Sequence, residues 1–160
     1  MTLSTNIVML LCLTYTLHTS ETLETLLETK HNEDCPTNWI THGQNCYQYF
    51  KKNVEWETAR ANCKGYGADL VVIEDSAENH FVDKLTNVKK WIGLHKDREG
   101  RFAWVTHERS TYTKYAKDEP NNWKGDEDCV MMYKSGEWND RKCNLKLAYV
   151  CEKLTHFGEA

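Results

Sequence analysis

The segment DEPNNWKGDEDC, from Asp118 to Cys129, places five acidic side chains within twelve positions, around Pro120. Like charges at this density repel one another, so another interaction must offset the repulsion. Water around an exposed loop can do so, and a bound cation can do so by direct coordination. The residues on either side of the segment decide between these two explanations.

A long stretch with little periodicity, residues 106–128, contains this segment. A loop of this length without regular structure is, in a compact domain, either functional or disordered. The aromatic residues Tyr112, Tyr115 and Trp123 argue against disorder. The sequence therefore predicts an ordered, functional loop.

Extended and helical segments alternate elsewhere in the chain. Trp56 and Cys63 lie at helical spacing, which predicts a helix over 54–64 with Cys63 on its buried side. Asp75 with Glu78 three residues later is a capping pattern, so we expect a second helix to begin there. The segments typical of strands are 91–94, 101–105, 129–133 and 147–151. Two helices with mainly short strands predict an α+β domain.

The first twenty residues contain no Asp, Glu, Lys or Arg, and the run at 7–13 is apolar. This run is too short to span a bilayer, and small residues follow it, which is typical of a secretory signal peptide over 1–20. A buried N-terminal strand is the alternative. We therefore expect a secreted, extracellular protein without membrane insertion, in which 21–34 is a short leader and 154–160 a C-terminal tail.

Removal of the signal peptide takes away Cys12 and leaves an even number of cysteines. An even number in an exported domain predicts a disulfide framework, but six cysteines allow 15 pairings and spacing alone selects none. Zinc binding is the alternative, although no Cys-x-x-Cys pair occurs. The six are Cys35, Cys46, Cys63, Cys129, Cys143 and Cys151. With all six paired internally, any homo-oligomer should be non-covalent.

The charge distribution excludes one class of partner. The chain has 20 Lys+Arg against 24 Asp+Glu, a formal net charge of -4. No basic stripe is longer than the pair Lys89–Lys90. We therefore predict no nucleic-acid partner.

Three motifs occur in order among the cysteines: Trp91-Ile92-Gly93-Leu94, Glu119-Pro120-Asn121 and Trp138-Asn139-Asp140. In this combination the chain resembles the C-type lectin carbohydrate-recognition domain, from Cys35 to Glu152. The resemblance implies a domain over 35–153 with a C-type lectin-like fold: two helices, short antiparallel strands and a long calcium-binding loop. It also implies three disulfides: Cys35–Cys46, Cys63–Cys151 and Cys129–Cys143.

Five side chains carry oxygen atoms suited to calcium: Glu119, Asn121, Glu127, Asn139 and Asp140. Calcium takes about 6–8 oxygen ligands, including carboxylates and amide carbonyls, so we predict that this first ligand set binds Ca²⁺. Alternate residues of an extended chain point to one side, which suits Glu119 and Asn121. The resemblance implies a cis Glu119–Pro120 bond, and an ordinary trans turn proline is the alternative.

Two neighbouring sugar hydroxyls could complete the calcium shell, with Glu119 and Glu127 as acceptors and Asn121 and Asn139 as donors. In the family, Glu-Pro-Asn accompanies mannose, fucose or N-acetylglucosamine, so we predict mannose-type glycan binding. Trp123 lies where galactose-binding relatives place an aromatic ring, which keeps galactose open. Alternatively, Trp123 covers the core of the loop.

A second calcium site is common in the family. Its candidates here form the second ligand set: Asp97, Glu99, Asn122 and Asp128. The match is poorer, because Asn122 replaces an expected acid and the loop 94–100 is one residue short. A solvated acidic loop is the alternative.

Two other classes of function compete with a lectin. The fold could bind another protein, or ice, with calcium serving stability alone. Paired carboxylates could also serve a glycosidase. Ligands committed to a cation are poor proton donors, however, and no nucleophile–base pair stands out, so we predict that the chain is not an enzyme.

Overall fold

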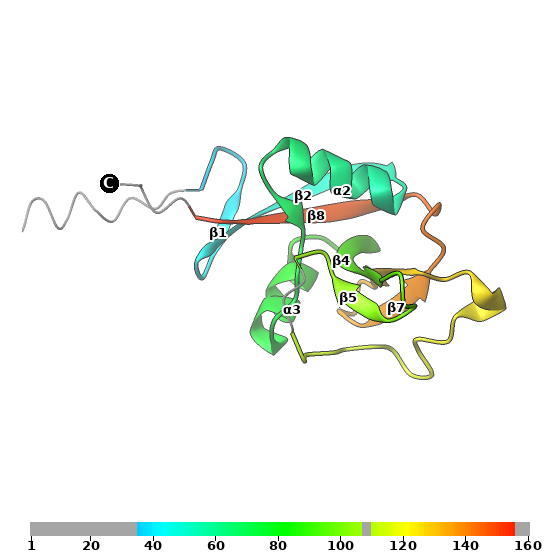
Figure 1. Cartoon of the computed structure of the whole chain (residues 1–160). Coiled ribbons are helices and arrows are strands. Elements are labelled where there is room, and N and C mark those ends of the chain that lie inside the picture. The colour runs from blue at the N-terminus through cyan, green and yellow to red at the C-terminus, as the bar shows by residue number, and fades with distance from the viewer. Residues whose placement is uncertain (1–34, 107–109, 156–160) are drawn as a thin grey trace, which may run out of the picture. The chain divides into compact units, whose positions relative to one another are not determined.

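A computed structural model describes residues 35–106 and 110–155, and the residues Cys35–Thr155 form one compact unit (Figure 1). The predicted signal peptide, leader and most of the predicted tail lie outside the described residues. In chain order the elements are β1 (Ile40–His42), β2 (Asn45–Val54), α2 (Trp56–Gly65), β3 (Asp69–Leu70), α3 (Ser76–Lys84), β4 (Lys90–Lys96), β5 (Phe102–Trp104), the 3-10 turn η2 (Trp123–Gly125), β6 (Cys129–Met132), β7 (Trp138–Arg141) and β8 (Leu147–Leu154). Within these described residues, no helix is both long and apolar enough to cross a membrane.

The strands form one sheet in the order β1-β2-β8-β4-β6-β7, with β3 paired to β8 and β5 paired to β4. The pair β4–β8 is parallel, with Lys90 opposite Ala148, and the other pairs are antiparallel. The expectation of antiparallel strands is therefore wrong for this one pair. The long stretch of chain between β4 and β8 makes parallel pairing possible, since such pairing needs a crossover of about a dozen residues or more.

The two helices begin at residues that are fixed by nearby interactions, and they lie on different sides of the sheet. Helix α2 begins at Trp56 rather than at Val54, because Val54 still pairs with Leu147 as the last residue of β2. Helix α3 begins as predicted: the Asp75 carboxylate accepts a hydrogen bond from the backbone N–H of Glu78 at 2.9 Å. Figure 1 shows α2 on one side of the β2–β8 pair and α3 on the other.

Apolar side chains from both helices and most strands form a continuous core. Trp91 and Trp138 are fully buried and Trp104 nearly so, which confirms their assignment to the core. The three disulfides implied by the family resemblance are present: Cys35–Cys46, Cys63–Cys151 and Cys129–Cys143. Cys63–Cys151 joins α2 to β8, and each such cross-link stabilises the fold by about 2–4 kcal/mol.

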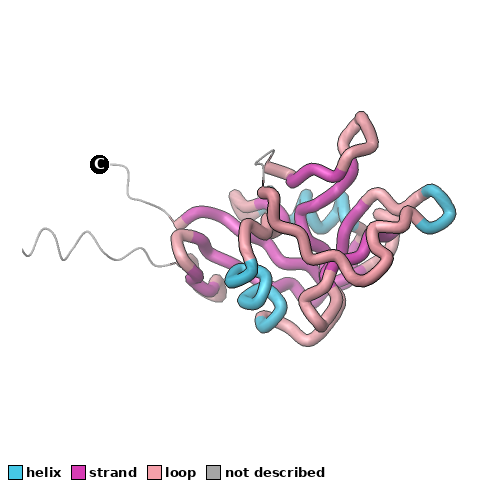
Figure 2. Tube along the Cα trace, turned by 90° about the horizontal axis from the view of Figure 1, so that it is seen from below, coloured by secondary structure: helices cyan, strands magenta, loops and turns pink. Residues whose placement is uncertain are grey.

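The long loop runs from β5 to β6 outside the sheet and contains η2 as its only helical turn among the described residues (Figure 2). Its course is guided by backbone hydrogen bonds to β7. The backbone N–H of Ala116 donates to Trp138 O at 2.8 Å, and the N–H of Trp138 donates to Lys114 O at 2.8 Å. The loop is thus attached to the edge of the sheet where the Trp-Asn-Asp motif lies.

Candidate functional site

Strand β7 presents the Trp-Asn-Asp motif from a rigid base. The indole N–H of Trp138 donates to Asn79 Oδ1 at 2.8 Å, and the Asn79 amide donates to Gly136 O at 3.0 Å. Trp138 and Asn79 are both buried, so each polar group needs this partner. Asn139 and Asp140 follow directly and are also buried. Trp138 therefore positions the two predicted calcium ligands, as its place in the motif suggests.

The Glu-Pro-Asn segment folds against Asp140. The Glu119–Pro120 bond is cis, as the family resemblance implies. The Asp140 carboxylate accepts hydrogen bonds from the backbone N–H groups of Asn121 and Asn122, at 3.1 Å and 2.7 Å. One buried carboxylate on β7 thus anchors the backbone directly after the proline.

Glu127 performs the same task for the turn η2. It is 2% exposed, and its carboxylate accepts from the backbone N–H of Trp123 at 2.8 Å and from Arg141 Nη1 at 3.1 Å. Its own backbone N–H donates to Asn122 Oδ1 at 3.1 Å. Asp140 therefore anchors the loop backbone at Asn121 and Asn122, and Glu127 anchors it at Trp123.

Two buried oxygen atoms of the first ligand set have no hydrogen-bond partner, Glu119 Oε2 and Asn139 Oδ1. Asn139 Nδ2 donates to Glu119 Oε1, so the two side chains touch and leave one free oxygen each. Unpaired buried polar atoms are costly, and they mark places where a missing ion or ligand can bind.

The carboxylates of Glu119 and Asp140, which carry like charges, also lie close together in this site. Burial and the neighbouring Asp140 carboxylate raise the pKa of Glu119 above its ordinary value. Two facing carboxylates with free oxygens beside them fit a hard divalent cation, because it would neutralise the charge and fill the open coordination positions. Within the described residues no three His, Cys, Asp or Glu side chains come together as a metal-binding group, so the two carboxylates of Glu119 and Asp140 would need the amide oxygen of Asn139 as a further ligand. Glu127 is buried and is connected to the same loop by its hydrogen bonds with Trp123 and Asn122, and Asn121 is exposed.

The structure suits some of the predicted hydrogen-bond partners of a sugar better than others. Both oxygens of Glu127 already accept hydrogen bonds, and Asn139 Nδ2 donates to Glu119 and, at 2.9 Å, to Tyr133 Oη. Asn121 is exposed. Of the predicted donors, Asn121 is thus the freer one in this structure.

Trp123 is 57% exposed, so the alternative in which it covers the core of the loop is wrong. The Lys124 ammonium lies 4.2 Å from the centroid of the Trp123 ring. Lys124 reaches that position from a backbone φ of 61°, in the left-handed region. The loop therefore exposes the Trp123 ring to solvent, with the Lys124 ammonium over the ring.

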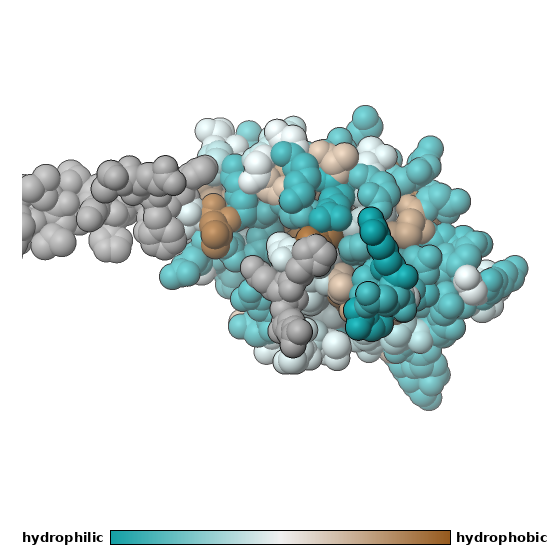
Figure 3. Space-filling view, in the orientation of Figure 1, coloured by the Kyte–Doolittle hydropathy of each residue, from teal (hydrophilic) through white to brown (hydrophobic). Residues whose placement is uncertain are grey.

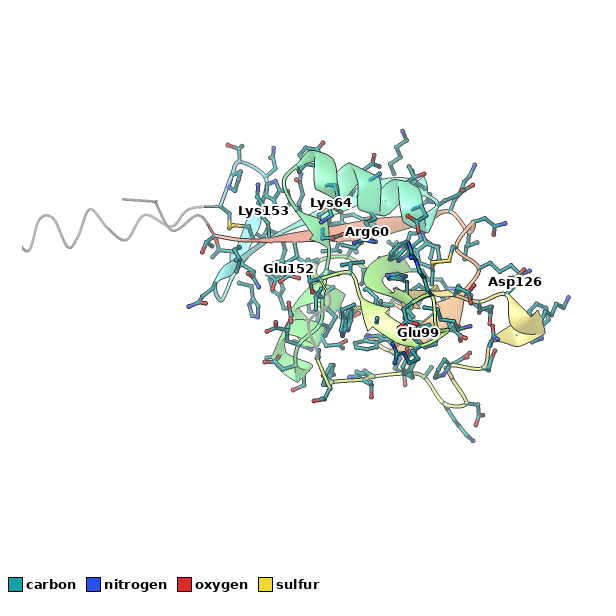
Figure 4. All side chains as sticks on the ribbon, viewed as in Figure 1. Arg60, Lys64, Glu99, Asp126, Glu152 and Lys153 are labelled. Carbon is teal, nitrogen blue, oxygen red and sulfur yellow. A yellow bond between two sulfur atoms is a disulfide. The ribbon has the colours of Figure 1, made fainter. Side chains whose placement is uncertain are left out.

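In the second ligand set every carboxylate is paired with a basic side chain, whereas in the first set, among the described residues, only Glu127 is, through Arg141. Asp97 and Glu99 contact Arg101, and Asp128 contacts Lys96. Figure 4 shows Glu99 on the β4–β5 connection and Asp126 on the long loop. The structure does not leave the second set open for an ion.

Sequence reasoning missed three residues that support the site. Tyr133 contacts Asn139, Arg141 contacts Glu127, and Tyr115 carries a buried hydroxyl group without a partner near Asp140. Arg141 could have been suspected, since it directly follows the Trp-Asn-Asp motif. Tyr133 reaches Asn139 only through the pairing of β6 with β7.

The comparisons with known proteins agree with this geometry. The family described as "Lectin C-type domain" matches residues 52–153. The chain belongs to the C-type lectin family. As a C-type lectin domain it is non-enzymatic, in agreement with the prediction from its residues.

The similar proteins include receptors and solved lectin domains. Asialoglycoprotein receptor 2 of Mus musculus is 38% identical over 135 residues, which cover 78% of this chain and 44% of the receptor. This C-type lectin chain thus spans less than half the length of that relative. The crystal structure of the cow CD23 carbohydrate-recognition domain, in the presence of a GlcNAc2Man3 oligosaccharide, has a TM-score of 0.74 and 35% identity, covering 77% of this chain and 98% of that one. A calcium-independent type II antifreeze protein has a TM-score of 0.72 and 26% identity, covering 77% of this chain and 96% of its own.

Proposed function

We propose that this C-type lectin domain is a secreted, calcium-dependent glycan-binding module of the mannose type. The observation that carries the proposal is the pair of buried, unpartnered oxygens, Glu119 Oε2 and Asn139 Oδ1, next to the facing Asp140 carboxylate. Burial of a polar atom without a hydrogen-bond partner costs free energy, and neither an apolar loop nor a solvated loop requires it.

Glu119, Asn121, Glu127, Asn139 and Asp140 would hold the calcium ion. The bound ion would accept two neighbouring sugar hydroxyl oxygens and would neutralise the carboxylates around it. Glu119 would accept a hydrogen bond from a sugar hydroxyl group, and the exposed Asn121 side-chain amide would donate one. Figure 3 shows a mostly hydrophilic surface with a few apolar patches on the face in view.

A single exposed sugar buries little surface, so one site binds weakly and useful avidity comes from several sites. The cysteines of the described residues are all joined in disulfides within the domain. We therefore expect any homo-oligomer to be non-covalent and to separate in size-exclusion chromatography under dilution without reductant.

The test is retention on immobilised mannose and galactose, with calcium and again with EDTA. We expect calcium-dependent retention on mannose that EDTA reverses, and weaker retention on galactose through Trp123. Asp126→Asn is a suitable control, because Asp126 lies in the same loop but is exposed and contacts Lys142. Loss of retention in Asn121→Asp but not in the control supports the proposal, and failure of the unmodified protein to bind either sugar refutes it.

A second candidate function is protein or ice binding with calcium in a purely structural role. The likeness to a calcium-independent type II antifreeze protein favours it. Thermal hysteresis of the purified protein, undiminished by EDTA and by Asn121→Asp, would assign the chain to this class instead.

A further inference from the structure

Lys96, the last residue of β4, is fixed against the end of the long loop. Its Nζ lies 2.8 Å from Asp128 Oδ1, and its backbone N–H donates to Asp128 O at 2.8 Å. The Lys96 side chain is 16% exposed and its ammonium lies 5.5 Å from the centroid of the Phe102 ring. These contacts place one positive charge directly against a carboxylate of the second ligand set.

Arg101 does the same on the β4–β5 connection. Its Nε and Nη2 donate to Asp97 Oδ2 at 3.1 Å and 3.0 Å, and Nη2 also contacts Glu99. The other oxygen, Asp97 Oδ1, accepts the backbone N–H groups of Glu99 and Arg101 at 2.9 Å each. Both oxygens of Asp97 are therefore occupied by donors of its own turn.

The remaining member, Asn122, has its side-chain oxygen engaged by the backbone N–H of Glu127. Each of the four side chains thus contacts a donor within the chain, and two basic groups face three carboxylates. The first ligand set differs, because Glu119 Oε2 and Asn139 Oδ1 are buried without a partner. A second calcium ion would have to displace cations that are already in contact with its ligands.

We propose that Lys96 and Arg101 replace a second calcium ion in this protein. Lys96 links the end of β4 to the end of the long loop, and Arg101 holds the carboxylates of the β4–β5 connection, so that neither segment needs a metal. Calcium then binds in the loop at the first ligand set only. This proposal goes beyond the glycan-binding function and holds whether or not a sugar binds.

The test is a calcium titration of the full chain by isothermal calorimetry, comparing the number of ions bound by each variant. In the unmodified protein, we expect Asp128→Asn to leave that number unchanged. The double variant Lys96→Gln, Arg101→Gln frees three carboxylates, so we expect it to bind one additional ion. Few charged ligands make such a site weak, with a dissociation constant of about 10⁻⁴–10⁻³ M. Adding Asp128→Asn to the double variant should abolish the additional ion.

Lys51→Gln, Arg98→Gln is the matched control, since it removes the same charge from two exposed side chains. It should bind as many ions as the unmodified protein. Circular dichroism in the aromatic region checks that each variant is folded. Loss of an ion on Asp128→Asn in the otherwise unmodified chain overturns the proposal, and this measurement stands even if the double variant does not fold. An additional ion that also forms in the control, or none in a folded double variant, overturns it as well.

Discussion

Substitution of Asp140 by Asn tests the candidate site most directly. Asp140 is fully buried and its two oxygens accept the backbone N–H groups of Asn121 and Asn122. An asparagine keeps one acceptor but places an amide donor against the other N–H group. Loss of one charge-assisted hydrogen bond costs about 1.5–3 kcal/mol, and relief of the repulsion with Glu119 offsets part of this. We expect the calcium-free domain to lose about 1–2 kcal/mol of unfolding free energy.

The larger effect should be on stabilisation by calcium. At a calcium concentration of 100 times Kd, binding stabilises the folded state by about 2.7 kcal/mol. For a domain of this size, that corresponds to an increase in Tm of about 10 °C. Asp140→Asn should lose most of this gain, because it removes both a ligand and the anchor of the loop.

The assay is differential scanning fluorimetry with EDTA and with saturating calcium. Asp126→Asn is the control, since Asp126 is an exposed acid of the same loop and should keep the full calcium-dependent shift. An Asp140→Asn variant that is stabilised by calcium as much as the control would refute the assignment of Asp140 to the metal site.

Three further predictions concern the core, the pH dependence and the sugar preference. Trp138→Phe leaves the buried Asn79 Oδ1 without its donor and should lower the unfolding free energy by about 2–4 kcal/mol in urea denaturation; a loss below about 1 kcal/mol contradicts its role as an anchor. Burial, with the nearby charge of Glu78, raises the pKa of Glu152 to about 8 (labelled in Figure 4), so the folded state keeps a proton that the unfolded chain releases near its ordinary pKa. Calcium-free stability should therefore fall as pH rises from about 4.5 to 8, by up to about 1.4 kcal/mol per pH unit, and Glu152→Gln should flatten this dependence in urea titrations; an unchanged slope rejects the assignment. Trp123→Ala should abolish galactose retention and spare mannose, whereas equal loss of both sugars on affinity columns would exclude stacking on its ring.

Local signals, and the resemblance to the C-type lectin domain, predicted much of the fold. Asp75 and Glu78 identified the start of α3 because a capping pattern is a local interaction, and its geometry needs no distant residue. The strand pattern did not reveal the ten-residue strand β2, and the helix predicted from Val54 began two residues too early. Strand β2 is defined by its pairing with β8, about a hundred residues away, which a local pattern does not contain.

The sequence by itself determined the candidate oxygen ligands, since Glu119, Asn121 and Asp140 belong to motifs that can be read one residue at a time. The sequence marked the second ligand set as the poorer match, and only the tertiary structure showed which side chains pair with its carboxylates. The first set contains buried oxygens without partners, whereas the carboxylates of the second are paired with Lys96 and Arg101. The reason is physical: a basic side chain close to a carboxylate competes with a metal ion for it, and the distance between the two side chains is decided by how the chain folds.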